Sequence, residues 1–294
     1  MKKMIDNLSE IRAWIEQPRD ISRLTSNDEF MKLIVELMNF SLYLLRVGAS
    51  LAPSDRAAES GYSKRAAIIV AHMVRTAKLY EGALVFVADG KGELAAIFIR
   101  LAMETVVRME YMIQSKAKSS TSRSFVVTSY RPEKEIVDDL GRKARTRALT
   151  PIEERIIRKI RSRLRQDRIS LKALRERHRW ELDGKNFRTI LGEVWSEDLY
   201  SYAFGSGSHS VHGDWYDLSQ YHLARAGGRY QPKLTYEAPD PRYACPLTAI
   251  CLRGLTNYLR WSQSDPDGVV SSIAERLQRL NLSLDRAHEK YLSR

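Results

Sequence analysis

Apolar residues recur along most of this chain at the spacing of one face of an α-helix, and strand-like alternation is nearly absent. A first helix is predicted from Ser26 to Gly48, and a second starts at Ser63. A third, expected to be buried, is predicted over 93–114. In the first of these, helical spacing joins Phe30, Ile34, Leu37, Met38, Leu42 and Leu45. The pattern predicts an all-α protein, a multi-helix bundle with long central helices.

Short polar and proline-containing motifs mark where further helices begin. Thr150-Pro151-Ile152-Glu153 is typical of a capping box with proline at the first helical position. Asp265-Pro266 predicts the start of the last helix. The Ser/Thr/Lys-rich stretch 115–131 is predicted to be a loop, and the Pro-, Tyr- and Gly-rich segment 227–245 to be irregular.

Positive charge is concentrated in one part of the chain. The net charge is +12, and residues 142–179 carry 15 Lys and Arg against 4 Asp and Glu. We therefore divide the chain into an N-terminal helical region (1–50), a helical core (51–222) with a basic helical insertion (142–179), and a C-terminal region (223–294) that begins with the irregular segment.

The basic insertion contains a helix with a narrow apolar stripe of Ile152, Ile156, Ile160 and Leu164. The cations on its other faces are Arg155, Arg158, Lys159, Arg161, Arg163 and Arg165. Such a helix is either a solvated face or a surface for an acidic partner. Because arginine pairs well with phosphate, we expect RNA or DNA as the partner, with an acidic protein as the alternative.

Several classes of protein are not indicated. The N-terminus lacks the unbroken apolar run of a signal peptide, and no stretch reaches the roughly 20 apolar residues of a membrane span. We therefore expect no membrane partner. Cys245 and Cys251 match no zinc or redox spacing, so we expect reduced thiols and a cytoplasmic location. Phosphate-binding glycine loops, nucleophile elbows and dinucleotide fingerprints are absent from the sequence, and no cofactor is expected.

Four polar residues stand out as candidate site residues. Arg100 and Glu104 lie one turn apart in the apolar third helix, where they form either a structural ion pair or part of a site. Ser208 and His212 have the same spacing, and His212 is a candidate general acid or base.

A metal site is an alternative at the same segment. His209, His212 and Asp214 have the spacing of metal ligands, but no second ligand cluster matches them. We therefore predict no metal, while their role stays open.

The order of these short motifs resembles the bacterial domain-of-unknown-function family numbered 5677, from about residue 63 to 222. The motifs are Arg100-x-x-x-Glu104, Phe125 with Ser129-Tyr130, a basic helix, Trp180, Gly184, and Tyr200 with Ser208-x-x-x-His212. The resemblance implies an all-helical fold without an established activity. It also implies that Arg100, Glu104, Ser208 and His212 are recurrent polar positions.

That family is in turn similar to the HEPN helical superfamily, many of whose members are ribonucleases or toxins of defence and toxin–antitoxin systems. Those enzymes carry an Arg and a His on one helix and complete the site across a dimer, so the resemblance implies a homodimer. No Arg precedes His212 at that distance, and only Arg65 and His72 fit the spacing.

Two functional hypotheses follow. In the first, the protein is a nucleic-acid-associated helical protein acting as a metal-independent endoribonuclease. His212 would then be the general base or acid, Arg100 would stabilise phosphate charge, Glu104 would orient Arg100 or a histidine, and Ser208 would position the substrate. In the second, these four residues form a buried polar clasp in a non-catalytic interaction module.

Overall fold

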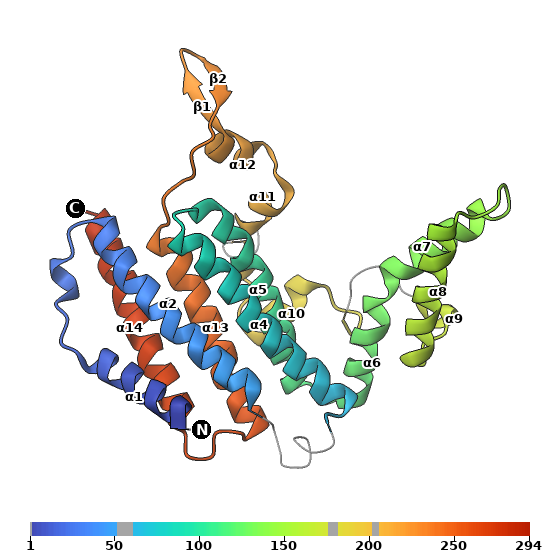
Figure 1. Ribbon diagram of the computed structural model, residues 1–294, viewed down its shortest axis with the longest axis horizontal. Helices are drawn as coiled ribbons and strands as arrows, with labels where there is room; N and C mark the ends of the chain where they lie inside the picture. Colours follow the sequence, from blue (N-terminus) through green and yellow to red (C-terminus); the bar gives the residue numbers. More distant parts are fainter. Residues whose placement is uncertain (1, 52–60, 176–181, 202–205) are drawn as a thin grey trace. The chain divides into compact units, whose positions relative to one another are not determined.

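A computed structural model of the chain describes residues 2–51, 61–175, 182–201 and 206–294 (Figure 1). The chain forms two compact units: unit 1 contains Met1–Gln114 and Leu191–Arg294, and unit 2 contains Ser115–Ile190. Over the described ranges the chain is helical except for connecting segments, one two-stranded sheet and an isolated bridge, so the all-α prediction is confirmed. None of the described helices is long and apolar enough to span a bilayer.

Five long helices pack together in unit 1 (Figure 1). They are α2 (Asn27–Ser50), α4 (Lys64–Ala88), α5 (Gly92–Gln114), α13 (Pro241–Ser262) and α14 (Val269–Leu292). Helix α13 contacts the other four. Helix α1 (Lys2–Glu16) packs on α14, and a 3-10 turn, Ile21–Arg23, then leads into α2. The core is therefore built from helices that come from both ends of the chain.

Side-chain caps start two of these helices as predicted. The hydroxyl of Ser26 accepts a hydrogen bond from the backbone N–H of Glu29, and that of Ser63 accepts one from Ala66. Each cap satisfies one of the N–H groups that the first turn of a helix leaves without a partner.

The prediction that Gly48 ends α2 was wrong, because the helix continues to Ser50. A Cβ placed on Gly48 would lie only 2.3 Å from Cδ1 of Leu255 on α13. Glycine at this position therefore lets a neighbouring helix approach closely.

The last helix begins later than Asp265-Pro266 suggests, at Val269. Asp265 nevertheless serves its start, because its carboxylate accepts hydrogen bonds from the N–H groups of Val270 and Ser271 at 3.2 and 2.8 Å. The predicted start was therefore wrong, because Gly268 is the N-cap and Pro266 lies in the turn before the helix.

Both cysteines lie on α13 as buried free thiols. Burial raises the pKa of Cys245 to about 12 and raises the pKa of Cys251 as well, since a thiolate is poorly solvated there. Nearby, the hydroxyl groups of Tyr80 and Thr248 hydrogen-bond at 2.7 Å inside the core.

The described residues between Phe187 and the start of α13 form only short elements. After α10 (Phe187–Val194) come α11 (Ser206–His212), α12 (Trp215–Asp217), a π-helical turn Leu218–His222, β1 (Leu223–Ala226) and β2 (Arg229–Pro232). The two strands pair antiparallel across a turn at Gly227 and Gly228. From 233 to 240 the chain has no regular structure. The predicted irregular segment, 227–245, is confirmed only there and at the turn, because β2 occupies Arg229–Pro232 and α13 begins at Pro241.

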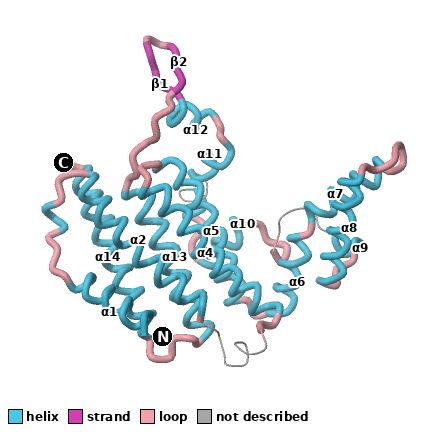
Figure 2. The backbone as a smooth tube through the Cα atoms, in the orientation of Figure 1, coloured by secondary structure: helices cyan, strands magenta, loops and turns pink. Residues whose placement is uncertain are grey.

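Unit 2 is a small helical unit (Figure 2). Its helices are α6 (Lys118–Ser129), α7 (Arg131–Lys143), α8 (Pro151–Gln166) and α9 (Leu171–Arg175). Its buried core is made by Val127, Val137, Ile160, Leu164 and Leu174, with Tyr130, Ile169 and Leu171 packed against it.

The prediction of a loop at 115–131 was wrong, because α6 occupies most of it. Its hydroxyl groups find local or tertiary partners instead of water. Ser122 donates to the carbonyl of Lys118, and Thr121 donates to the carboxylate of Asp183 at 2.7 Å. The backbone N–H of Asp183 in turn donates to the hydroxyl of Ser124. A Ser/Thr-rich stretch thus forms a helix because another segment satisfies its polar face.

Candidate functional site

Three of the four predicted catalytic residues meet where α11 packs against α5. Nη1 of Arg100 donates a hydrogen bond to the hydroxyl of Ser208 at 2.5 Å. Nε of the same arginine donates to the carboxylate of Glu104 at 3.4 Å. The side chains of Arg100 and Glu104 are 13% and 20% exposed, so the contact is largely removed from solvent.

Further cations surround this contact. Nη2 of Arg108 lies 3.2 Å from the second oxygen of Glu104, and Nε of Arg75 donates to the hydroxyl of Thr105. Burial, opposed in part by Glu104, lowers the pKa of Arg108 from its ordinary value. The carboxylate of Glu104 therefore pairs with two guanidinium groups, those of Arg100 and Arg108, in a half-buried contact. Such a contact can hold helices together or bind an anion.

The fourth predicted residue, His212, does not join this network. It lies on α11 one turn after Ser208, but its side chain is exposed. Over the part of the chain that the structure describes, it has no hydrogen bond to Arg100, Glu104 or Ser208. A helical spacing of four placed the two side chains on one side of α11, but it did not determine how far each reaches into the contact with α5.

A different histidine, His209, has a carboxylate partner that can orient its ring. Nδ1 of His209 lies 2.6 Å from the carboxylate of Asp214. The other oxygen of Asp214 accepts from the N–H groups of Tyr216 and Asp217, which caps α12. The ring of Tyr216 lies 4.7 Å from that of His209. The hydrogen bond with His209 is the main cause that lowers the pKa of Asp214.

This pairing was missed because the sequence suggested His209 and Asp214 as metal ligands together with His212. No group of three metal-ligating side chains is present among the residues that the structure describes. The signal for the pair was the turn between its members, where Gly213 has a φ of 59° and lets the chain fold back from α11 to the cap of α12.

Arg65 and His72 on α4 have the spacing of the HEPN pair, but they contact different backbone carbonyl groups. Nη2 of Arg65 donates to the carbonyl of Met112 at the end of α5. His72 is buried, and its Nδ1 lies 2.7 Å from the carbonyl of Ile68. Burial lowers the pKa of His72 to about 4, and Arg108 and Arg75 add to the effect. Arg65 therefore joins α4 to the end of α5, whereas this hydrogen bond of His72 lies within α4.

Unit 2 carries the predicted nucleic-acid-binding residues. The capping box at the start of α8 is present as predicted, with Thr150 and Glu153 bonded reciprocally. All six predicted cations of α8 are exposed: Arg155, Arg158, Lys159, Arg161, Arg163 and Arg165. The apolar stripe is only half packed, since Ile160 and Leu164 are buried while Ile152 and Ile156 are exposed.

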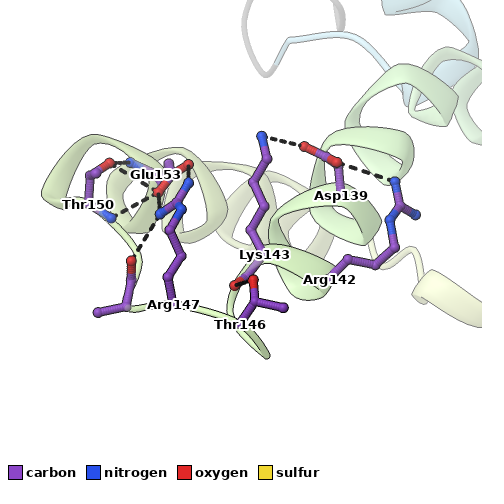
Figure 3. A network of polar contacts seen from close by, with 8 residues as sticks. Asp139, Arg142, Lys143, Thr146, Arg147, Thr150 and Glu153 are labelled. Carbon is purple, nitrogen blue, oxygen red and sulfur yellow. Dashed lines mark hydrogen bonds and ion pairs between the residues drawn. The ribbon is translucent and has the colours of Figure 1, made fainter.

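The cations of unit 2 differ in whether a carboxylate neutralises them. In the last turn of α7, Arg142 and Lys143 pair with Asp139, and in the connection to α8, Arg147 makes two hydrogen bonds to Glu153 (Figure 3). Within the described ranges, none of the six cations of α8 has an ion pair with a carboxylate. Their charge is therefore available to an external anion.

The excess positive charge of the chain lies in unit 2. Residues 115–190 contain 22 Lys and Arg against 10 Asp and Glu, so unit 2 accounts for the whole net charge of +12, and unit 1 is neutral. The predicted basic insertion is thus half of a separate compact unit, whose field would act on an anionic ligand.

Comparison with curated proteins and with solved structures finds no match for this chain. One family model matches, that of a family of unknown function, DUF5677, over residues 66–229. The match covers more than half of the chain, and it includes the contact between α5 and α11, the His209–Asp214 pair and the whole of unit 2. This chain is therefore a member of the family of unknown function DUF5677.

Proposed function

We propose that this protein binds nucleic acid, RNA in preference to DNA, through the phosphate backbone, and that the exposed face of α8 makes the contact. The observation that carries the proposal is the set of six exposed cations on α8 that no carboxylate neutralises within the described ranges. One helix thus presents positive charge on several sides, in the unit that holds all the excess charge of the chain.

The composition of this face favours phosphate as the ligand. Five of the six cations are arginines, whose planar guanidinium groups can donate two parallel hydrogen bonds to one phosphate. Backbone contacts of this kind position a protein on nucleic acid without reading its bases. We therefore expect binding with little sequence preference and with a strong dependence on salt.

The proposal is tested by measuring the affinity of labelled RNA and DNA, by fluorescence anisotropy, over a series of salt concentrations. The test variant combines Arg158→Glu with Arg161→Glu. The control combines Arg260→Glu with Arg279→Glu, two exposed arginines of α13 and α14, and changes the net charge equally. We expect the test variant to bind far more weakly. Its logarithmic salt slope on a single strand should fall by about 0.7 for each phosphate that the variant no longer neutralises.

Two results would contradict the proposal. One is the absence of binding by the unaltered protein at low salt. The other is an equal fall in affinity in both double variants, which would show that only total charge matters. Retention of an acidic protein by the α8 face in the absence of nucleic acid binding would instead support the alternative partner class.

A second candidate function, cleavage of RNA without a metal, is favoured by the hydrogen bond between His209 and Asp214. A histidine held by a carboxylate can accept the proton of a ribose 2′-hydroxyl. The 2′-oxygen would then bond to the adjacent phosphorus, and the bond from phosphorus to the 5′-oxygen would break. That oxygen takes a proton from solvent, which leaves a 2′,3′-cyclic phosphate and a 5′-hydroxyl.

Cleavage is tested with end-labelled RNA in the presence of a metal chelator. His209→Ala and Asp214→Asn should reduce cleavage strongly if this pair acts, whereas His212→Ala should do so if the histidine predicted from the sequence acts. If Ser208→Ala lowers stability and leaves binding and cleavage unchanged, Arg100, Glu104 and Ser208 form a structural clasp. Failure of the unaltered protein to cut RNA that it binds would leave the protein a binding module.

A further inference from the structure

Large aromatic side chains lie exposed around the hairpin of β1 and β2 in unit 1. Trp215 and Tyr216 on α12 are each 60% exposed, and Tyr230 on β2 is 44% exposed. Aromatic side chains supply large amounts of buried apolar area in most folds, so a group of exposed ones indicates a surface that a ligand covers.

The hairpin holds these rings in a defined arrangement. Gly227 and Gly228 both have positive φ, 55° and 79°, which suits the tight turn of a two-residue hairpin. The register places Arg225 directly opposite Tyr230, and the guanidinium carbon lies 6.0 Å from the centre of the Tyr230 ring. The ring of Trp215 meets that of Tyr230 edge-on, with centroids 5.4 Å apart. We call Trp215, Arg225 and Tyr230 the hairpin cluster.

The uncompensated charge at this hairpin is positive. Arg225 and Arg229 flank the turn, and both are exposed. Within the described ranges neither forms an ion pair with a carboxylate. By contrast, the acidic groups nearby are engaged, since Asp217 lies 3.4 Å from His222 and Glu237 pairs with Lys233.

We propose that the hairpin cluster binds a single-stranded nucleic acid, with unpaired bases stacked on Trp215 and Tyr230 and phosphates contacted by Arg225, which shares a face of the hairpin with Tyr230. The inference rests on the proposed function and adds its substrate class. Aromatic rings beside arginines bind single strands, because every base has a face that can stack and every nucleotide carries a phosphate. In a duplex the same faces are stacked on neighbouring bases and are out of reach.

The charge also argues against a second copy of this chain as the occupant. A symmetric contact through the hairpin cluster would bring the Arg225 side chains of two chains close together without a carboxylate between them, and like charges placed together are unfavourable. Phosphates of a single strand would neutralise the same arginine.

The experiment compares the affinity of the full chain for a labelled oligouridine of about 15 nucleotides with its affinity for a duplex of the same length. The variants are Trp215→Ala, Tyr230→Ala and the conservative Trp215→Phe. The control is Tyr62→Ala, which removes an exposed aromatic ring near the start of α4. We expect the two alanine variants to raise the Kd for oligouridine roughly tenfold and to leave the Kd for the duplex unchanged. Trp215→Phe and Tyr62→Ala should bind oligouridine nearly as the unaltered protein does.

Equal affinities for the single strand and the duplex, or no effect of either alanine variant, would overturn this inference while leaving binding through α8 intact. So would a change in the mass measured by sedimentation for Trp215→Ala, because a second copy would then cover the cluster. If neither nucleic acid binds at low salt, the proposed function fails first and the inference with it. Duplex binding by the variant that combines Arg158→Glu with Arg161→Glu separates the two proposals, because it depends on α8 and not on the hairpin cluster.

Discussion

Acidification should destabilise unit 1 through one buried histidine on α4, His72. Its ring is almost fully removed from solvent, and its Nδ1 lies 2.7 Å from the carbonyl of Ile68. The ring is therefore neutral and donates its Nδ1 proton to that carbonyl. Burial lowers the pKa of His72 to about 4, well below the ordinary value of a histidine, and the neighbouring Arg108 and Arg75 disfavour a second proton further.

The size of the effect follows from the difference between the two pKa values. In the unfolded chain this histidine takes up a proton below about pH 6.5, whereas in the folded protein it does so only near pH 4. Because the unfolded state binds more protons in this window, the free energy of unfolding falls as the pH falls. Each unit of difference amounts to about 1.4 kcal/mol, so the loss from this one ring reaches about 2 kcal/mol near pH 5.

The assay is urea unfolding of the unaltered protein and of His72→Gln at about pH 7.5 and about pH 5. Glutamine keeps an N–H donor for the carbonyl of Ile68 but takes up no proton. The variant should be the less stable protein at the higher pH, and this deficit should shrink by about 2 kcal/mol at the lower pH. His212→Gln, at an exposed histidine, should show no such change and controls for titration elsewhere. The same deficit at both pH values would refute the reasoning.

Three further substitutions test how the helices are held. Glu110→Ala removes a buried carboxylate that accepts a hydrogen bond from Nε1 of Trp195 at 2.8 Å, and it should lower the free energy of unfolding by about 1–2 kcal/mol in urea titrations, because that N–H is left without its acceptor. Thr150→Ala removes the side-chain cap of α8 and should destabilise unit 2 by about 1 kcal/mol, which hydrogen exchange in α8 would report. Gly48→Ala places a Cβ 2.3 Å from Cδ1 of Leu255, and the overpacking should cost about 1–3 kcal/mol of stability and so lower the thermal midpoint. An unchanged midpoint would show that Leu255 moves aside freely.

Local sequence determined the helices wherever periodicity and a cap agreed. Ser26 and Ser63 begin α2 and α4 as predicted, and the capping box at Thr150 begins α8. These signals are reliable because the groups that interact lie within one turn of each other. The concentration of positive charge was also readable from the sequence, since counting charges requires no structure.

Tertiary partners decided what local signals could not. Helix α6 was missed because its hydroxyl groups are satisfied partly by Asp183, a residue far along the chain. Gly48 was taken for a helix end because its partner, Leu255, lies on a helix much later in the chain.

The same distinction applies to the candidate site. The sequence identified Arg100, Glu104 and Ser208, but only the packing of α11 on α5 showed that Arg100 reaches Ser208. Among the described residues His209, rather than His212, has a carboxylate partner, because the turn at Gly213 folds Asp214 back toward α11. Helical spacing determines which side of a helix a residue occupies, whereas contact with another helix depends on how the two pack. Sequence therefore determined the elements and their charges, and tertiary packing decided which polar groups meet.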